Sequence, residues 1–235
     1  MECGECMPAN VQWRPASYAL SAEDVPIILA SVSIYCACIA QGICISVVTT
    51  SQRQMAQTAE VEVADIGTVV FAGGVGFMLG CLLFTLLLDV LDAPKHYLCC
   101  AASMIGGLFT FLLVQTTSYS LMALFVLMQM VGLGGVLLFA TLSMLEMWGQ
   151  RVQPWMQMKA SSCGLGLVAG PVMAAHWGYR AACLWASLLC VTPLLVILLL
   201  LGWQVWQMQG QQHGLERGWG LELSSSSSSS SKDTD

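Results

Sequence analysis

Polar side chains that could bind a solute are rare inside the long apolar segments of this chain. We single out Tyr35, Gln41 and Gln129, which interrupt runs of aliphatic residues. An amide side chain offers two donors and an acceptor oxygen, and a phenol offers a hydroxyl, so these groups could hold a neutral polar solute. The two glutamines could equally make bonds between helices, each worth about 0.6–2 kcal/mol. Both interpretations remain open from the residues alone.

Other kinds of chemistry lack the residues that they need. No nucleophile–base pair or phosphate-cradling loop is present, so neither an enzyme nor a cofactor is expected. Cys3 and Cys6 have the C-x-x-C spacing of half a zinc site, but no second pair accompanies them, and we expect no metal. No basic patch suggests nucleic acid. The titratable groups closest to the apolar segments, such as Asp89 and Lys159, fall at segment ends. We therefore expect no proton relay inside the segments.

Long apolar segments must position these polar groups. Hydrophobic residues make up 57% of the chain and charged residues only 9%, against about 25% charged in an average soluble domain. One helical crossing of a bilayer needs about 20 apolar residues. The sequence therefore predicts an all-α, polytopic membrane protein. Its six predicted transmembrane helices lie at about 26–49, 65–88, 96–114, 121–145, 158–176 and 179–203.

Polar ends flank this predicted transmembrane domain of residues 26–203. Residues 1–25 form a polar leader, and residues 204–235 form a tail with eight consecutive serines that is too polar to order itself. Lysine and arginine placement favours cytosolic N- and C-termini, because six such residues then lie on the cytosolic side and two outside. The six are Arg14, Lys95, Arg151, Lys159, Arg217 and Lys232, and the two are Arg53 and Arg180. The membrane itself, plasma or internal, stays open.

Small residues recur at the spacing of helix–helix contacts. Gly76 and Gly80 form one G-x-x-x-G pair, and Gly166 and Gly170 form another. Glycines four apart share one helix face and let a neighbouring backbone approach closely. Pro171 follows directly and removes a backbone donor, so a kink is predicted there.

These motifs resemble the major facilitator superfamily. The segment from Gly164 to Pro171 is similar to the superfamily's G-x-x-x-G-P segment of span five, and Gly178-Tyr179-Arg180 is similar to the start of its span six. A glycine, an aspartate and a basic residue around the second loop also match, at Gly80, Asp89 and Lys95, although Val90 stands where an arginine is expected. The resemblance implies conformational or gating roles for a set of residues. They are Gly80, Asp89, Lys95, Gly166, Gly170, Pro171 and Arg180.

Within the superfamily, two stretches resemble the sodium-dependent glucose transporter branch, also called major facilitator superfamily domain-containing protein 4. One runs from Gly132 to Gly149, and the other from Gln153 to Gly166. The branch carries a polar patch where this chain has the mainly apolar stretch 137–141. Its members are transporters, and the resemblance extends over roughly residues 26–203.

The resemblance implies half of a twelve-span transporter, with the three-plus-three inverted repeat of that half. It places Tyr35, Gln41 and Gln129 beside the cavity, and it implies alternating-access transport of a small neutral organic solute such as a sugar. A half of this kind would form a homodimer or pair with another half, within membrane lipid. The alternative is a non-transporting interaction or scaffold protein derived from a transporter, which Val90 and the apolar 137–141 stretch favour. A channel would need a pore loop or charged ring, and the sequence has neither.

Overall fold

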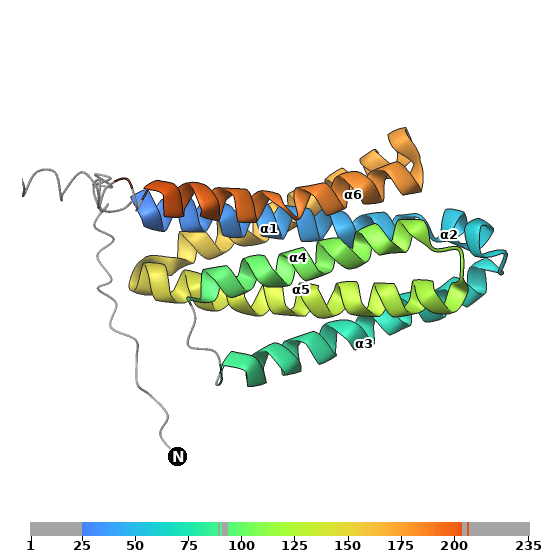
Figure 1. Ribbon diagram of the computed structural model, residues 1–235, viewed down its shortest axis with the longest axis horizontal. Coiled ribbons are helices and arrows are strands. Elements are labelled where there is room, and N and C mark those ends of the chain that lie inside the picture. Colours follow the sequence, from blue (N-terminus) through green and yellow to red (C-terminus); the bar gives the residue numbers. More distant parts are fainter. Residues whose placement is uncertain (1–24, 89, 91–93, 204–205, 207–235) are drawn as a thin grey trace, which may run out of the picture.

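The computed structural model describes residues 25–88, 90, 94–203 and 206, and within these ranges every regular element is a helix (Figure 1). The predicted leader, the serine-rich tail, Asp89 and the Cys3–Cys6 pair lie outside these ranges. The helices are α1 (Val25–Thr50), α2 (Gln52–Ala59), α3 (Val63–Leu88), α4 (Lys95–Gln115), α5 (Tyr119–Trp148), the short 3-10 turn η2 (Gly149–Arg151), α6 (Val152–Leu189) and a helix over 192–203.

Four helical stretches in the described ranges are long and apolar enough to cross a membrane. They are Val25–Thr50, Val63–Leu88, Lys95–Gln115 and the 85-residue stretch Tyr119–Trp203. The all-α prediction is confirmed, and the long apolar helices suggest a membrane-embedded protein. The fourth stretch is far longer than the roughly 20 residues of one crossing, and it contains α5, α6 and the final helix.

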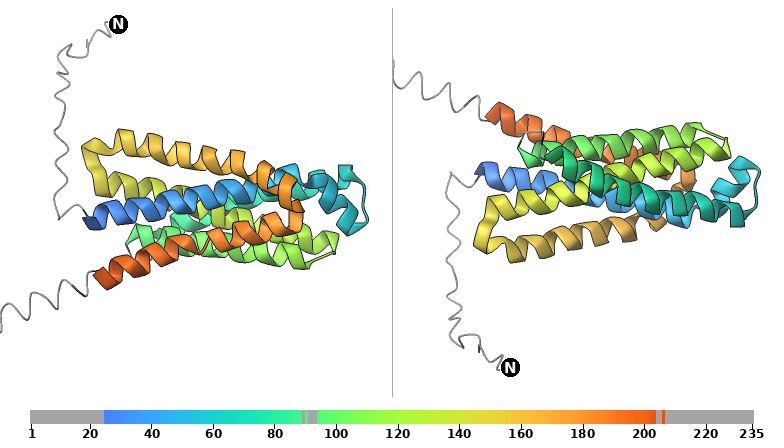
Figure 2. Two further views of the ribbon diagram at one scale, coloured as in Figure 1. Left: turned by 90° about the horizontal axis from the view of Figure 1, so that it is seen from above. Right: turned by 90° about the horizontal axis from the view of Figure 1, so that it is seen from below.

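The chain reverses direction inside α6, at Gly178 (Figure 2). Gly178 has φ 77° and ψ 164°, a conformation that only glycine adopts at low cost. The reversal falls between the fifth and sixth predicted helices, 158–176 and 179–203. Pro171 lies inside α6, seven residues before Gly178, which is the one residue of that helix with non-helical dihedral angles. The kink expected at Pro171 stays a prediction.

Two local predictions were wrong. The stretch 50–64 between the first two predicted helices, where we expected no helix, contains α2, which buries Met55 and Ala56 beneath its polar outer face. The last segment, expected to run unbroken over 179–203, has a turn at 190–191 before it continues. Pro193 cannot donate a backbone hydrogen bond, which explains why the helix is interrupted just before it.

Three helix pairs make the main contacts, and two of them join helices that are not consecutive in the chain. α1 packs chiefly on α6, while α5 packs on both α3 and α4 (Figures 1 and 2). α3 is the most peripheral of the long helices, with 28% of its most apolar window buried. Its outer face carries exposed Phe71, Met78 and Leu86, as expected of a surface that meets lipid rather than water.

Glycines set the closest approaches between these helices, as the G-x-x-x-G pattern predicts. A Cβ on Gly42 of α1 would lie 2.5 Å from the Cys163 carbonyl oxygen and 3.0 Å from the Gly166 Cα. On the α3–α5 pair, a Cβ on Gly80 would lie 2.8 Å from the Val131 Cα. Apolar helices gain nothing by leaving apolar lipid for one another, so this close backbone packing supplies much of their association energy.

Candidate functional site

Gln41 lies in the centre of the bundle, where α1 meets α4. Its side chain is 1% exposed, and its Nε2 donates to the Ser103 carbonyl oxygen at 3.4 Å. Its Oε1 has no partner among the described residues, and neither has the Ser103 hydroxyl. Gly106 makes room for the amide, since a Cβ there would lie 2.7 Å from Gln41 Nε2.

Gln129 of α5 is as buried as Gln41, and its side chain makes fewer hydrogen bonds. Its exposure is 1%, and neither its Nε2 nor its Oε1 has a hydrogen-bond partner in the described structure. Three residues further on, a Cβ on Gly132 would lie 3.0 Å from the Gly106 Cα. Gly106 thus contacts both the Gln41 side chain and the α5 backbone, which places the two glutamines on helices that converge around one glycine. Buried amides without partners are costly, so they are suited to binding a polar group.

Tyr35 lies apart from the two glutamines. It precedes Gln41 by six residues on α1, or about 9 Å along the helix axis. Its hydroxyl donates to the Trp155 carbonyl oxygen at 3.4 Å. Trp155 stacks on Trp148, with ring centroids 3.8 Å apart, and Trp148 Nε1 donates to the Ser31 hydroxyl at 3.0 Å. The structure therefore places Tyr35 in a tryptophan cluster at one end of the bundle.

Lys159 is a functional candidate that the sequence reasoning missed. We expected it at a segment end, but its side chain is only 8% exposed, and Nζ donates to the Thr141 hydroxyl at 2.6 Å. No carboxylate pairs with it within the described ranges, where the one ion pair joins Lys95 to Glu146. The sequence reasoning placed the start of this helix too late. α6 begins at Val152, so Lys159 lies about two turns inside it. An ionisable group inside a membrane helix is a functional candidate by default.

The predicted gating residues divide into two groups. Gly80, Gly166 and Gly170 all lie in close helix contacts, and a Cβ on Gly170 would collide with the Ser46 hydroxyl. That hydroxyl donates to the Gly42 carbonyl at 2.9 Å and to the Gly166 carbonyl at 3.3 Å, which bridges α1 and α6. These contacts make the α1–α6 crossing a tight one.

Two further predicted gating residues, Lys95 and Arg180, lie near helix ends or turns, whereas Pro171 lies inside α6 and Asp89 lies outside the described residues. Lys95 at the start of α4 pairs with Glu146 near the end of α5, which fastens one end of the bundle. Arg180 lies at the opposite end, next to the Gly178 turn. The start of α4 and the turn inside α6 lie at opposite ends of the bundle (Figure 1).

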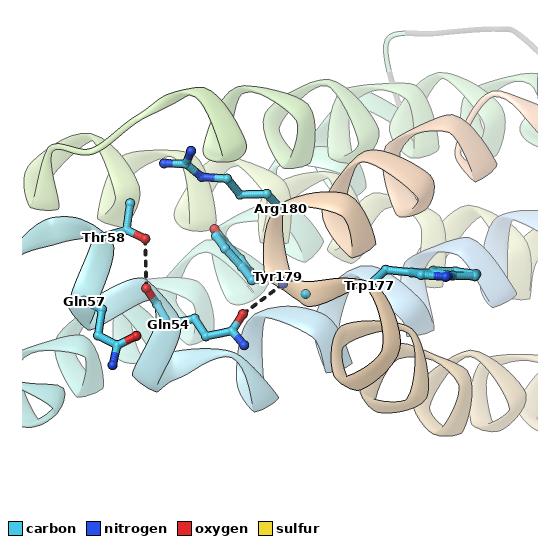
Figure 3. Close-up of a pocket in the computed structure, with 7 residues that line it drawn as sticks. Gln54, Gln57, Thr58, Trp177, Tyr179 and Arg180 are labelled. Carbon is cyan, nitrogen blue, oxygen red and sulfur yellow. Dashed lines mark hydrogen bonds between the residues drawn. The ribbon is translucent and has the colours of Figure 1, made fainter.

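A pocket of about 380 Å³ adjoins the Gly178 turn (Figure 3). It lies between α2 and the two arms of α6. Gln54 Oε1 accepts a hydrogen bond from the Tyr179 backbone N–H at 2.9 Å, and the Thr58 hydroxyl donates to the Gln54 carbonyl at 2.9 Å. The side chain of Gln54 thereby satisfies the first free N–H of the helix that begins after the turn, as an N-cap residue would.

Comparison with protein-family models, with curated proteins and with solved structures finds no match for this chain.

Proposed function

We propose that this protein is a transmembrane solute transporter of the major facilitator type, or a half-sized form of one. It moves a small neutral polar solute, such as a sugar, by alternating access. One observation carries the proposal, namely a pair of helix crossings in which the glycine contacts share the same residue spacing.

The first crossing joins α1 to α6 at Gly42. A Cβ on Gly42 would meet the Cys163 carbonyl, the Gly166 Cα and the Leu167 nitrogen. These contacts fall on residue 163 of α6 and on the residues three and four positions after it.

The second crossing joins α5 to α3 at Gly134 with the same spacing. A Cβ on Gly134 would meet the Phe77 carbonyl, the Gly80 carbonyl carbon and the Cys81 nitrogen. The reverse contacts also agree. Gly166 faces the Ile39 carbonyl, three residues before Gly42, and Gly80 faces the Val131 carbonyl, three residues before Gly134.

This correspondence supports the proposed three-plus-three repeat. In that repeat α1 is equivalent to α5, and α3 is equivalent to the part of α6 before Gly178. The third members of the two proposed triplets are α4 and the helical segments after Gly178, and the proposal counts these as six membrane spans. Transporters built from such repeats bind their solute near the middle of the membrane.

Gln41 and Gln129 are the groups that we assign to solute binding. Both are buried inside long helices, and three of their four polar side-chain atoms lack partners in the described structure. A solute with hydroxyl groups would satisfy those atoms. One half alone encloses no path, so the active form is a homodimer or a pair with another half. Arg53 and Arg180 then lie outside, and both termini lie in the cytosol.

The second candidate is a non-transporting interaction protein. The stretch 137–141 supports this candidate. It is mainly apolar where the sodium-dependent glucose transporter branch has a polar patch, and its Thr141 hydroxyl already accepts a hydrogen bond from Lys159. Such a protein would use the same fold to associate with larger relatives or other membrane partners.

Uptake of radiolabelled glucose into proteoliposomes distinguishes the two candidates. We expect uptake by the wild-type protein, and a loss of at least about tenfold in Gln41→Ala and Gln129→Ala, since each removes a bond to the solute. The matched control is Gln115→Ala, which changes an exposed amide at the end of α4 and should leave uptake unchanged. Absence of uptake across a panel of neutral solutes, with the protein folded, would favour the interaction protein.

A further inference from the structure

Two buried thiols from distant segments lie side by side in one apolar cluster of the bundle. Cys44 belongs to α1, Cys190 directly follows α6, and their sulfurs are 3.7 Å apart. Among the described cysteines, all of them free thiols, no other two sulfurs are in hydrogen-bonding contact. A disulfide has an S–S distance of about 2.05 Å, so the two sulfurs need to approach by less than about 2 Å to form one.

Helix α4 keeps Cys190 in this position from its other side. A Cβ on Gly107 would lie 2.5 Å from the Cys190 Cβ and 3.2 Å from the Cys190 sulfur. The Cys190 side chain is therefore enclosed between α1 and α4. The chain turns at 190–191 before the helix over 192–203 begins. A bond from Cys190 to Cys44 would tie this turn to α1.

An apolar pocket of about 270 Å³ adjoins Cys190. It lies between α4 and the end of α6, and Gly107 and Cys190 both form part of its wall. Leu108 and Leu188 also line it, and both are exposed on the outside of the bundle. Exposed aliphatic side chains on a membrane helix meet lipid, so the pocket adjoins the hydrocarbon of the bilayer. A small molecule that enters it must dissolve in hydrocarbon.

Oxidation is the chemistry that two touching thiols in an apolar site can perform. A hydroperoxide converts a thiol into a sulfenic acid, which condenses with a neighbouring thiol to a disulfide. Contact between the two sulfurs makes the second step effectively intramolecular. The hydroperoxides that form inside a bilayer are those of its unsaturated acyl chains, and they dissolve in hydrocarbon.

We propose that Cys44 and Cys190 are a redox pair that a lipid hydroperoxide oxidises to a disulfide, reaching Cys190 through the pocket beside Gly107. The Cys190 sulfur attacks the peroxide. An S–O bond forms, the O–O bond breaks, and the departing alkoxide takes the thiol proton to become an alcohol. The Cys44 sulfur then attacks the sulfenic acid. The S–S bond forms, the S–O bond breaks, and hydroxide leaves with the Cys44 proton as water.

Two thiols are thereby oxidised, and one hydroperoxide is reduced to an alcohol and water. The disulfide joins residues 146 positions apart and fastens the turn at 190–191 to the first described helix. Closing so long a loop stabilises the folded chain. The proposal requires a membrane-embedded protein but not transport, so it can fail while the transport function stands, and the reverse.

The test uses the reduced protein in liposomes of saturated phospholipid, which form no hydroperoxides of their own. Cumene hydroperoxide is the apolar probe and hydrogen peroxide the polar one, and peptide mapping by mass spectrometry follows the Cys44–Cys190 disulfide. Each rate is divided by the rate at which the same peroxide oxidises glutathione in solution, which removes the difference in intrinsic reactivity. We expect this ratio to be about tenfold higher for cumene hydroperoxide. Equal ratios would refute the apolar route.

Leu108→Trp tests the pocket itself. The larger ring occupies space that the hydroperoxide needs, so oxidation by cumene hydroperoxide should slow by about tenfold. Leu124→Trp is the matched control, because Leu124 is an exposed leucine on α5 outside the pocket lining. It should react at the wild-type rate. Equal rates in the two variants would overturn the assignment of the pocket.

Cysteine variants test the order of the two steps. Cys44→Ala should stop the reaction at a sulfenic acid on Cys190, which dimedone labels, and Cys190→Ala should leave Cys44 unreacted. Dimedone labelling of Cys44 in the second variant would refute the order. If either variant does not fold, the two tryptophan variants still decide the proposal, because their changes are on exposed surfaces.

Melting in detergent tests the effect of the bond. The oxidised wild-type protein should melt about 5 °C higher than the reduced protein, and dithiothreitol should reverse the difference. Cys44→Ala, which cannot form the disulfide, should show no such shift. An unchanged melting temperature in the fully oxidised wild-type protein would mean that the bond does not fasten the turn to α1.

Discussion

Gly42 of α1 and Gly166 of α6 lie so close together that a Cβ on either residue would overlap the backbone of the other helix. On Gly42 it would be 3.0 Å from the Gly166 Cα, and on Gly166 it would be 2.9 Å from the Gly42 Cα. These two residues are 124 positions apart in the sequence. Their contact therefore fixes how the beginning and the end of the described chain fit together.

Gly166→Ala should destabilise the protein, because the added methyl group meets backbone, including the Ile39 carbonyl, that cannot move aside cheaply. We expect a loss of about 1–3 kcal/mol, measured as a lower melting temperature in detergent. Gly164→Ala is the control on the same helix, since nothing lies within 4 Å of its Cβ position. It should leave stability unchanged or raise it slightly. Equal effects of the two substitutions would contradict the α1–α6 crossing.

Gly80→Ala should repeat this result on the α3–α5 crossing, where the methyl group meets the backbone of Val131. The same melting assay should again show a loss of about 1–3 kcal/mol. Gly74→Ala supplies the control, because its Cβ position is open. A tolerated alanine at Gly80 would contradict the equivalence of the two crossings and, with it, the proposed repeat.

Lys159→Met should preserve the fold and raise thermal stability in detergent. The ammonium is buried with a single hydroxyl partner among the described residues, and a methionine of similar length removes its desolvation cost. We expect a gain of roughly 1–3 kcal/mol. Lys95→Met, which breaks an exposed pair with Glu146, should change stability by less than about 1 kcal/mol. A strong loss on Lys159→Met would reveal an anionic partner for that lysine.

Cys44 and Cys190 should form a disulfide when the membrane protein is treated with copper phenanthroline. Their sulfurs are 3.7 Å apart, and both residues are free thiols in buried positions on segments 146 residues apart. Peptide mapping by mass spectrometry would detect the linked pair, and Cys44→Ser should abolish it. Oxidation that links other cysteines in preference to this pair would contradict the packing of α1 beside the turn at 190–191.

The long apolar helices could be predicted from the sequence. A run of about twenty apolar residues in lipid must satisfy its backbone hydrogen bonds internally, and a helix does so. The glycine pairs also gave correct contacts. Gly80 and Gly166 lie where the backbones touch, although their spacing did not identify the partner helix. Partner choice depends on the arrangement of the whole bundle, which no local pattern contains.

The candidate site was harder to predict, because burial and pairing depend on neighbours distant in sequence. Gln41 and Gln129 lie on helices that converge around Gly106. Tyr35 instead donates a hydrogen bond to Trp155 and lies apart from the two glutamines. Lys159 looked terminal because α6 begins six residues earlier than the apolar run suggested. The helix α2 was missed because it is short, polar outside, and anchored by only Met55 and Ala56.

The hydrogen bond from the Tyr179 amide to the Gln54 side chain spans 125 residues and joins the first connection of the bundle to its last described reversal. During synthesis, Gln54 emerges long before Tyr179 exists. The final bend can therefore acquire its cap only after every intervening helix has been synthesised. A substitution in the first connection would then appear as a defect in closing the last hairpin, far along the chain from the altered codon.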